Sequence, residues 1–376
     1  MAGRYPGCGA RSRATPGKVL RDGGRSKTIV VISKLRRLAS VFLIGLLLPA
    51  CTADPPEARL QDYGERLSRT LGMDSKQVPP LVFSRFPAQA TFSMDPSRET
   101  IDILDLWSLR ECALHVVLAQ RNSSLGRVAQ PSTRMFYELE FLRLAPECIE
   151  HLVLQGKAEL AASLSEVRAR KEARLPWFIW QGVLGGGEYE SFWKVPQRLG
   201  SYPTTGNSPA ELALAALASD VRRWLSGDYQ FESAEVEANL QKLLSGDAGA
   251  LYKSAVLQKL YLGQIDAALE QRLQAGPVCK TPTDGRASIL NTVVRKYFVG
   301  SIQPWSVRIQ SRAFQLDAAR EIEELLAGVE PQDFARWRKA RDRVIDQALQ
   351  APSKHVETLL PIMRQCGLAP EDPATP

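Results

Sequence analysis

Apolar residues recur at helical spacing through almost all of the chain beyond residue 56. Leu60, Tyr63, Leu67 and Leu71 form one stripe along a predicted helix over residues 57–71, and later segments repeat this pattern. The two-residue alternation typical of strands is confined to short runs. The chain is therefore predicted to be mainly α: an irregular bundle of about ten helices.

Proline and glycine residues set the predicted boundaries of these helices, because proline cannot continue a helix that precedes it and glycine favours its end. Pro146 separates a helix over 132–144 from one that begins near 147, and Pro352 separates 331–350 from 353–366. The other predicted helices cover 101–120, 160–174, 208–226, 233–246, 247–274 and 305–327, while 289–298 fits a helix or a strand.

The domain organisation follows from these boundaries. A helical body is predicted over 57–367, followed by a disordered tail over 368–376. An extended proline-rich segment lies near the start of the body, with short strands expected at 81–83 and 90–92. The loop over 199–207 is the best candidate for a boundary between two subdomains.

The residues before the body have the order of an export signal. A basic stretch over 33–37 precedes the apolar run Leu38–Leu48, which is too short to span a bilayer as a helix. Leu48-Pro-Ala-Cys51 resembles the lipobox of bacterial lipoproteins, which makes Cys51 the site of lipid attachment after removal of a signal peptide over 30–50. The alternative is an ordinary signal peptide followed by an incidental cysteine.

Lipidation at Cys51 predicts attachment to a membrane through N-terminal acyl chains, with residues 51–56 as a tether. Thr52, where an aspartate would favour inner-membrane retention, favours the outer membrane with the body facing the periplasm; the inner membrane is the alternative. Residues 1–29 are rich in glycine and arginine and lack periodicity. We expect them to be a mis-annotated leader, with translation starting near Val30 or Val31.

The distribution of charge argues against nucleic acid as a partner. The formal net charge is +7, from 48 basic and 41 acidic residues. Ten of the basic residues and one of the acidic residues precede Cys51, so the rest of the chain carries 38 against 40. A body with a net charge of −2 lacks the basic surface that binds a phosphate backbone.

Four cysteines remain when Cys8 and Cys51 are set aside. In an exported protein an even number favours disulfides, and three pairings are possible. We expect the pairing between nearest neighbours in sequence: Cys112 with Cys148 and Cys279 with Cys366.

A metal site is the alternative for the first pair. Cys112 and His115, and Cys148 and His151, are C-x-x-H units whose spacing places each pair on one helix face. Because thiols oxidise in the periplasm, we expect a disulfide with incidental histidines and no metal.

The sequence contains none of the motifs that mark familiar reactions: no G-x-S-x-G, H-E-x-x-H, phosphate-binding glycine loop or G-x-G-x-x-G. No catalytic residue and no cofactor is therefore predicted. The charged residues within 320–324 and 336–343 are expected to form solvated helix faces, and His355 to lie on a surface helix.

Two segments are candidates for binding. Residues 175–196 gather aromatic side chains around three glycines, a composition that fits sugar binding or, as we favour, core packing. A predicted turn carries polar residues that fit a small anion or, as we favour, helix capping. They are Arg121, Asn122, Ser123, Ser124 and Arg127.

The block over 104–148 gives a family resemblance. Arg121-Asn-Ser-Ser-Leu-Gly-Arg127 and Tyr137-Glu-Leu-Glu-Phe-Leu-Arg143, the flanking cysteines and the lipobox resemble an uncharacterised family of Gram-negative lipoproteins. Weaker matches at 297–304 and 365–368 extend the resemblance over most of the mature chain. The resemblance implies an exported, lipid-anchored protein and supplies no reaction or ligand.

Together these features predict a non-enzymatic helical lipoprotein that contacts an envelope protein or peptidoglycan. The alternative is an envelope hydrolase, or a protein that binds a small ligand or glycan through the aromatic segment over 175–196.

Overall fold

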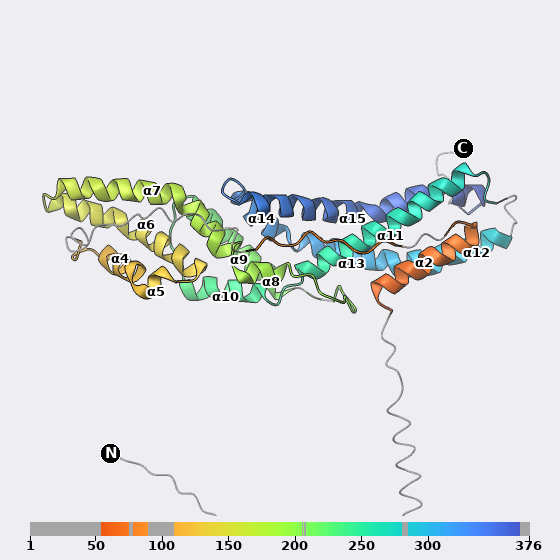
Figure 1. The fold of residues 1–376 in the computed structure, drawn as a ribbon, viewed down its shortest axis with the longest axis horizontal. Helices are drawn as coiled ribbons and strands as arrows, with labels where there is room; N and C mark the ends of the chain where they lie inside the picture. Colours follow the sequence, from red (N-terminus) through yellow and green to blue (C-terminus); the bar gives the residue numbers. More distant parts are fainter. Residues whose placement is uncertain are drawn as a thin grey trace, which may run out of the picture. The chain divides into compact units, whose positions relative to one another are not determined.

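The computed structural model describes residues 54–74, 78–88, 109–204, 206, 208–279 and 285–368. These residues belong to one compact unit, Asp54–Pro376, and contain helices but no strand. The prediction of a mainly α, irregular helical bundle is confirmed (Figure 1). Within the described part of the chain, no helix combines the length and apolar character needed to cross a bilayer.

Helix α2 (Pro56–Leu71) is the first described helix and follows the prediction closely. Pro56 supplies a fixed φ at the first turn, and Gly72 ends the helix in the left-handed conformation at φ 65°. Its apolar stripe is fully buried. It packs against α11 (Ala248–Gln274), α12 (Gly285–Val293) and the π-helix η2 (Val294–Ile302). Because α12 and η2 together cover residues 289–298, this segment, which fitted a helix or a strand, is helical.

The proline-rich segment over 78–88 has no regular secondary structure, so the strand expected at 81–83 is wrong. The nearby prolines remove hydrogen-bond donors that a strand requires. Aromatic side chains fix the segment instead: Phe83 lies 5.9 Å from Tyr252 between ring centroids, and Phe86 lies 4.7 Å from Trp337. The strand expected at 90–92 lies outside the described residues.

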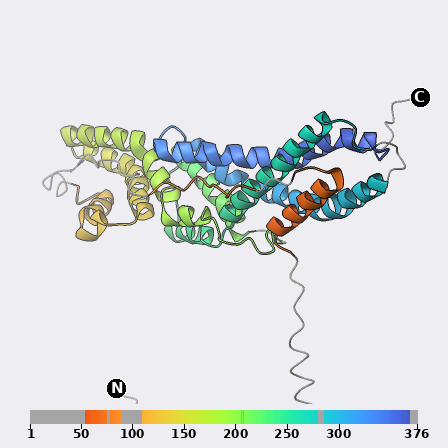
Figure 2. The same cartoon turned by 45° about the vertical axis from the view of Figure 1, so that its right-hand side comes forward.

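Helices α4 (Leu114–Asn122), α5 (Ser124–Arg127), α6 (Pro131–Leu154) and α7 (Ala158–Val183) follow one another in the chain. Helices α6 and α7 form an antiparallel hairpin, and α4 packs on α6 (Figures 1 and 2). The predicted helix over 101–120 is described only from residue 109, and its regular part begins at Leu114.

Helices α6 and α15 (Gln332–Gln365) continue through prolines that were expected to separate one helix from the next. Helix α6 runs through Pro146 and α15 runs through Pro352, so the helices predicted on either side of each of these prolines are single. Helix α15 also continues through Pro361, which lies inside the helix predicted over 353–366. Proline at 352 leaves the Ala348 carbonyl without its helical N–H partner. The side-chain amide of Gln258 on α11 donates to that carbonyl, which explains how the helix continues.

The opposite error occurs at 305–327, which is divided into α13 (Gln303–Phe314) and α14 (Asp317–Leu325). Leu316 lies between the two helices and is buried. The local pattern predicts one continuous helix here, but the chain breaks at the segment that contains this buried leucine. Helices α8 (Gly187–Phe192), α9 (Pro209–Leu225) and α10 (Ser233–Leu243) complete the described body. Ser208 caps α9 as expected, accepting a hydrogen bond from the Ala210 N–H at 3.3 Å.

Several predictions lie outside the described residues: the leader, the signal peptide, Cys51 and the tail beyond residue 368. The boundary near 199–207 also stays a prediction.

Candidate functional site

The four cysteines of the body form the two expected disulfides. Cys112 pairs with Cys148 and Cys279 pairs with Cys366, with Cα atoms 5.4 and 5.1 Å apart. The pairing prediction is confirmed, and the sulfurs of the first pair are bonded to each other rather than held as separate thiolates. His151 interacts through Nε2 with the Glu111 carboxylate at 3.3 Å.

The polar turn around Ser123 is divided between two roles. The Ser123 hydroxyl accepts a hydrogen bond from the Gly126 N–H at 3.0 Å and so caps α5. Arg121 does not cap a helix; its Nε–H donates to the buried Glu138 carboxylate at 2.9 Å. Asn122, Ser124 and Arg127 are exposed, and no contact among the described residues brings them together around an anion.

The aromatic side chains of 175–196 lie largely in the core. Trp177 and Trp180 stack with centroids 5.3 Å apart, and Trp180 meets Phe334 edge-on at 5.2 Å. Tyr189 and Phe192 are also buried, as is Trp193. This arrangement supports the packing interpretation and leaves little ring surface for a ligand.

The charged faces expected within 320–324 and 336–343 include a buried ion pair. Arg341 donates two hydrogen bonds to the Glu323 carboxylate at 2.7 and 2.6 Å, and both side chains are at most 1% exposed. The Arg341 guanidinium lies over the rings of both Trp193 and Trp337, 4.1 and 4.6 Å from their centroids. The expectation of fully solvated faces is therefore wrong, because paired charges and aromatic faces compensate the desolvation of the guanidinium.

The expectation for His355 is also wrong. Its Nδ1 lies 2.5 Å from an Asp266 oxygen, and its Nε2 lies 2.6 Å from the Tyr63 hydroxyl. His355 and Tyr63 have no exposed surface, and burial, followed by the charge of Asp266, raises the pKa of the Tyr63 hydroxyl. Hydroxyl, imidazole and carboxylate in series are typical of nucleophilic catalysis, but a substrate cannot reach a sealed site.

This network joins α2, α11 and α15 over sequence separations of 292 and 89 residues. Sequence reasoning missed it because no local pattern relates Tyr63 to His355. The only available signal was the position of Tyr63 on the apolar stripe of its helix, which indicated burial without indicating a partner.

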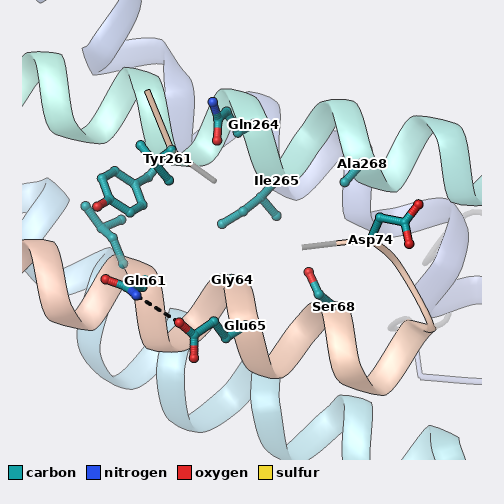
Figure 3. Close-up of a pocket in the computed structure, with 11 residues that line it drawn as sticks. Gln61, Gly64, Glu65, Ser68, Asp74, Tyr261, Gln264, Ile265 and Ala268 are labelled. Carbon is teal, nitrogen blue, oxygen red and sulfur yellow. Dashed lines mark hydrogen bonds between the residues drawn. The ribbon is translucent and has the colours of Figure 1, made fainter. Parts of the chain in front are cut away.

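An open groove of about 430 Å³ lies between the outward faces of α2 and α11 (Figure 3). This volume is within the range of small-molecule sites. The α2 wall carries Gln61, Glu65 and Ser68, and the α11 wall carries Tyr261 and Gln264. The remaining lining residues are Leu60, Gly64, Asp74, Val78, Ile265 and Ala268.

Gly64 and Ile265 bring the two walls of the groove close together. A Cβ atom at position 64 would lie 3.3 Å from the Ile265 side chain, so glycine permits the close approach of α2 and α11. Gln61 donates to the Glu65 carboxylate at 2.9 Å (Figure 3). Burial, followed by the negative charge of Glu57, raises the pKa of the Tyr261 phenol above its ordinary value.

The groove was not predicted from the sequence. Its polar residues occupy the outer face of an amphipathic helix, where most side chains have no function beyond solubility. A glycine inside the helix was the one local signal, because glycine costs about 1 kcal/mol there relative to alanine.

Comparison with known proteins gives a family without a reaction. No curated protein and no solved structure matches the chain. A family model described as "Protein of unknown function (DUF3080)" matches residues 60–370, a range that includes both disulfides and every residue that lines the groove. The chain therefore belongs to the DUF3080 family.

Proposed function

We propose that this chain is a lipid-anchored protein of the bacterial cell envelope that acts by binding an envelope partner rather than by catalysis. The observation that carries the proposal is the apolar run Leu38–Leu48 followed directly by Pro49, Ala50 and Cys51. Acylation of Cys51 attaches the body to a membrane, with about 0.8 kcal/mol for each buried methylene group.

The two disulfides support an oxidising compartment, because such bonds persist outside the cytoplasm and are rare inside it. Thr52 after the acylated cysteine favours the outer membrane, with the body in the periplasm.

The arrangement of polar groups supports binding. The described groups best placed for proton transfer, Tyr63, His355 and Asp266, are at most 3% exposed. The groove between α2 and α11 is accessible and lined by hydrogen-bonding groups, which suits reversible recognition of a ligand.

A labelling experiment tests the anchor. Cells that express the wild-type chain or a Cys51→Ser variant are fed an alkyne-tagged fatty acid, and their membranes are separated on a density gradient. We expect label in the wild type and in a Thr52→Ser control, in the outer-membrane fraction, and no label in the Cys51→Ser variant. An unlabelled, unprocessed wild-type chain among the cytosolic proteins would overturn the proposal.

A further inference from the structure

We propose that the outer face of η2 and α13 docks the body onto an anionic lipid bilayer, beside the anchor at Cys51. The inference deepens the anchored function proposed above and rests on it. Three apolar and three basic side chains define this surface, the η2–α13 face, and all six are exposed. They are Val299, Val307 and Phe314, and Arg295, Lys296 and Arg308.

The anchor holds the start of α2 close to the bilayer. Only Thr52 and Ala53 separate Cys51 from Asp54, the first described residue. A fully extended chain spans at most about 3.6 Å per residue, so Asp54 lies within about 11 Å of the acylated residue. Surfaces next to the start of α2 are therefore held at the lipid headgroups.

The η2–α13 face adjoins this end of α2. Helix α2 packs along η2 (Figures 1 and 2), and the Arg66 guanidinium lies 4.3 Å from the centroid of the Tyr297 ring of η2. Arg59, nearer to the start of α2, lies 6.0 Å from the centroid of the Trp305 ring of α13. The two contacts show that α2 runs antiparallel to η2 and α13, so α13 begins beside the anchored end of α2.

The segment that forms the face is basic, although the rest of the body is acidic. Residues 285–316 contain five arginines and lysines and no aspartate or glutamate, whereas the other residues of the mature chain have 33 basic against 40 acidic side chains. Arg312, one of the five, is buried in an ion pair. Arg295, Lys296 and Arg308 are exposed, and among the described residues none of the three forms an ion pair.

Two of the positive charges near the anchor repel each other. Burial, followed by the positive charge of Arg308, lowers the pKa of the Arg59 guanidinium, so the two side chains are within electrostatic reach. The carboxylates of Asp54 and Glu57 act in the opposite direction, each more weakly, and Glu57 also pairs with Lys253 at 3.8 Å. Anionic headgroups would relieve this repulsion, whereas an uncharged surface would not.

The apolar residues of the face project away from the core. Val299, Val307 and Phe314 are 48%, 59% and 60% exposed, while Phe298 and Ile309 on the inner side are buried. Val307 and Phe314 are two α-helical turns apart, and the wider turns of η2 bring Val299 to the same side. Exposed apolar residues with basic neighbours are typical of helices that lie in a membrane interface.

Fluorescence of the acylated full chain tests the proposal. The chain carries Val307→Cys or, as a control, Leu154→Cys at the exposed end of α6, each labelled with the environment-sensitive fluorophore NBD. Its acyl chains insert it into nanodiscs of phosphatidylcholine alone or of phosphatidylcholine with phosphatidylglycerol. We expect a blue shift and stronger emission at position 307 with phosphatidylglycerol, decreasing as salt is raised, and no change at position 154.

A charge-neutral variant separates the face from the anchor. Each basic side chain near an anionic surface strengthens binding about fivefold, so Arg295→Gln/Lys296→Gln/Arg308→Gln should lower the ratio of docked to undocked protein by about 100-fold. Circular dichroism shows whether each variant is folded. The matched control removes the same charge from exposed positions outside the face and should respond as the wild type does. It is Arg127→Gln/Lys157→Gln/Lys339→Gln.

The proposal is overturned if position 307 responds no more than position 154, if phosphatidylcholine alone gives the same response, or if the charge-neutral variant responds as the control does. In the first case the face is a candidate for an acidic protein partner instead. Intact mass shows whether the purified chain is acylated. An acylated chain that fails overturns this proposal alone, whereas a chain without acyl groups overturns the proposed anchor as well.

Discussion

Two regions of the molecule are each held together by a disulfide and a buried polar network, but the residues joined in one region are much further apart in sequence than those in the other. The hairpin region, α4 to α7, is crosslinked by Cys112–Cys148, while the three-helix region, α2, α11 and α15, is crosslinked by Cys279–Cys366. Each also buries a polar network. In the hairpin region Glu138 binds partners 17 and 33 residues away, whereas in the three-helix region the partners are 89 and 292 residues apart.

The difference teaches which part of the fold depends on the whole chain. Local partners meet after a small loss of chain entropy, so the hairpin region can gain its contacts early in folding. The three-helix region joins the first described helix to the last and acquires its network only when both are in place. Helix α2, which forms one wall of the groove, is therefore held in position by contacts between residues that are far apart in sequence.

The largest expected effect comes from removing the disulfides. Loop-closure entropy gives a loss in the free energy of unfolding of about 4.6 kcal/mol for Cys279→Ala/Cys366→Ala and about 3.8 kcal/mol for Cys112→Ala/Cys148→Ala, because the first closes the longer loop. Urea denaturation followed by circular dichroism measures both. A larger loss from the shorter loop would show that the contrast in chain distance does not govern stability.

The next effect tests the network of the hairpin region. Glu138→Ala removes a carboxylate that lies 2.6 Å from the Lys171 ammonium, and both side chains are at most 6% exposed. We expect a loss of about 3 kcal/mol in the free energy of unfolding, at the lower end for a broken buried pair because Arg121, its other partner, is one-third exposed.

A matched control lies two residues further along α6, on the opposite face of the helix. Glu140→Ala removes a carboxylate whose pair with Arg143 is at the surface, so the loss should stay below about 1 kcal/mol. Equal losses in the two variants would show that burial of Glu138 contributes nothing.

The same contrast between local and distant contacts explains how far the sequence could be interpreted. Helical spacing predicted the class of fold, the stripe of α2 and the cap at Ser208, because neighbours within a few residues determine them. It failed at Pro352, where a side chain from another helix satisfies the freed carbonyl, and at His355, whose two partners come from distant helices. The groove lies between helices that begin at residues 56 and 248, and it could not be found from either helix alone.

The third prediction concerns the network of the three-helix region. Tyr63→Phe deprives the buried His355 Nε2 of its partner and should lower the free energy of unfolding by about 2 kcal/mol at neutral pH. The effect should then depend on pH. Burial raises the pKa of Tyr63 in the folded protein, whereas the pKa of a tyrosine in the unfolded chain is about 10.

Above that pH the unfolded wild type releases a proton that the folded protein keeps, so its stability falls by about 1.4 kcal/mol per pH unit for this group. The phenylalanine variant lacks this loss, and the gap between the two chains should close as pH rises above 10. Urea titrations at several pH values measure the gap. Phe298→Leu, which removes a ring that contacts both Tyr63 and His355 but titrates nothing, should keep a constant gap.

The smallest effect tests whether α15 continues through Pro352 because of α11. Gln258→Ala removes the donor to the Ala348 carbonyl and should cost about 1 kcal/mol in the free energy of unfolding. In a Pro352→Ala background, residue 352 regains its N–H and can bond to that carbonyl within the helix, so most of this cost should disappear. In a Pro361→Ala background it should persist, because Pro361 lies nine residues further along α15 and frees a different carbonyl. A double-mutant cycle measures the coupling energy between Gln258 and each of the two prolines.

Equal coupling of Gln258 to Pro352 and to Pro361 would contradict this explanation. The hydrogen bond from Gln258 to the Ala348 carbonyl would then be a consequence of the continuous helix and not its cause.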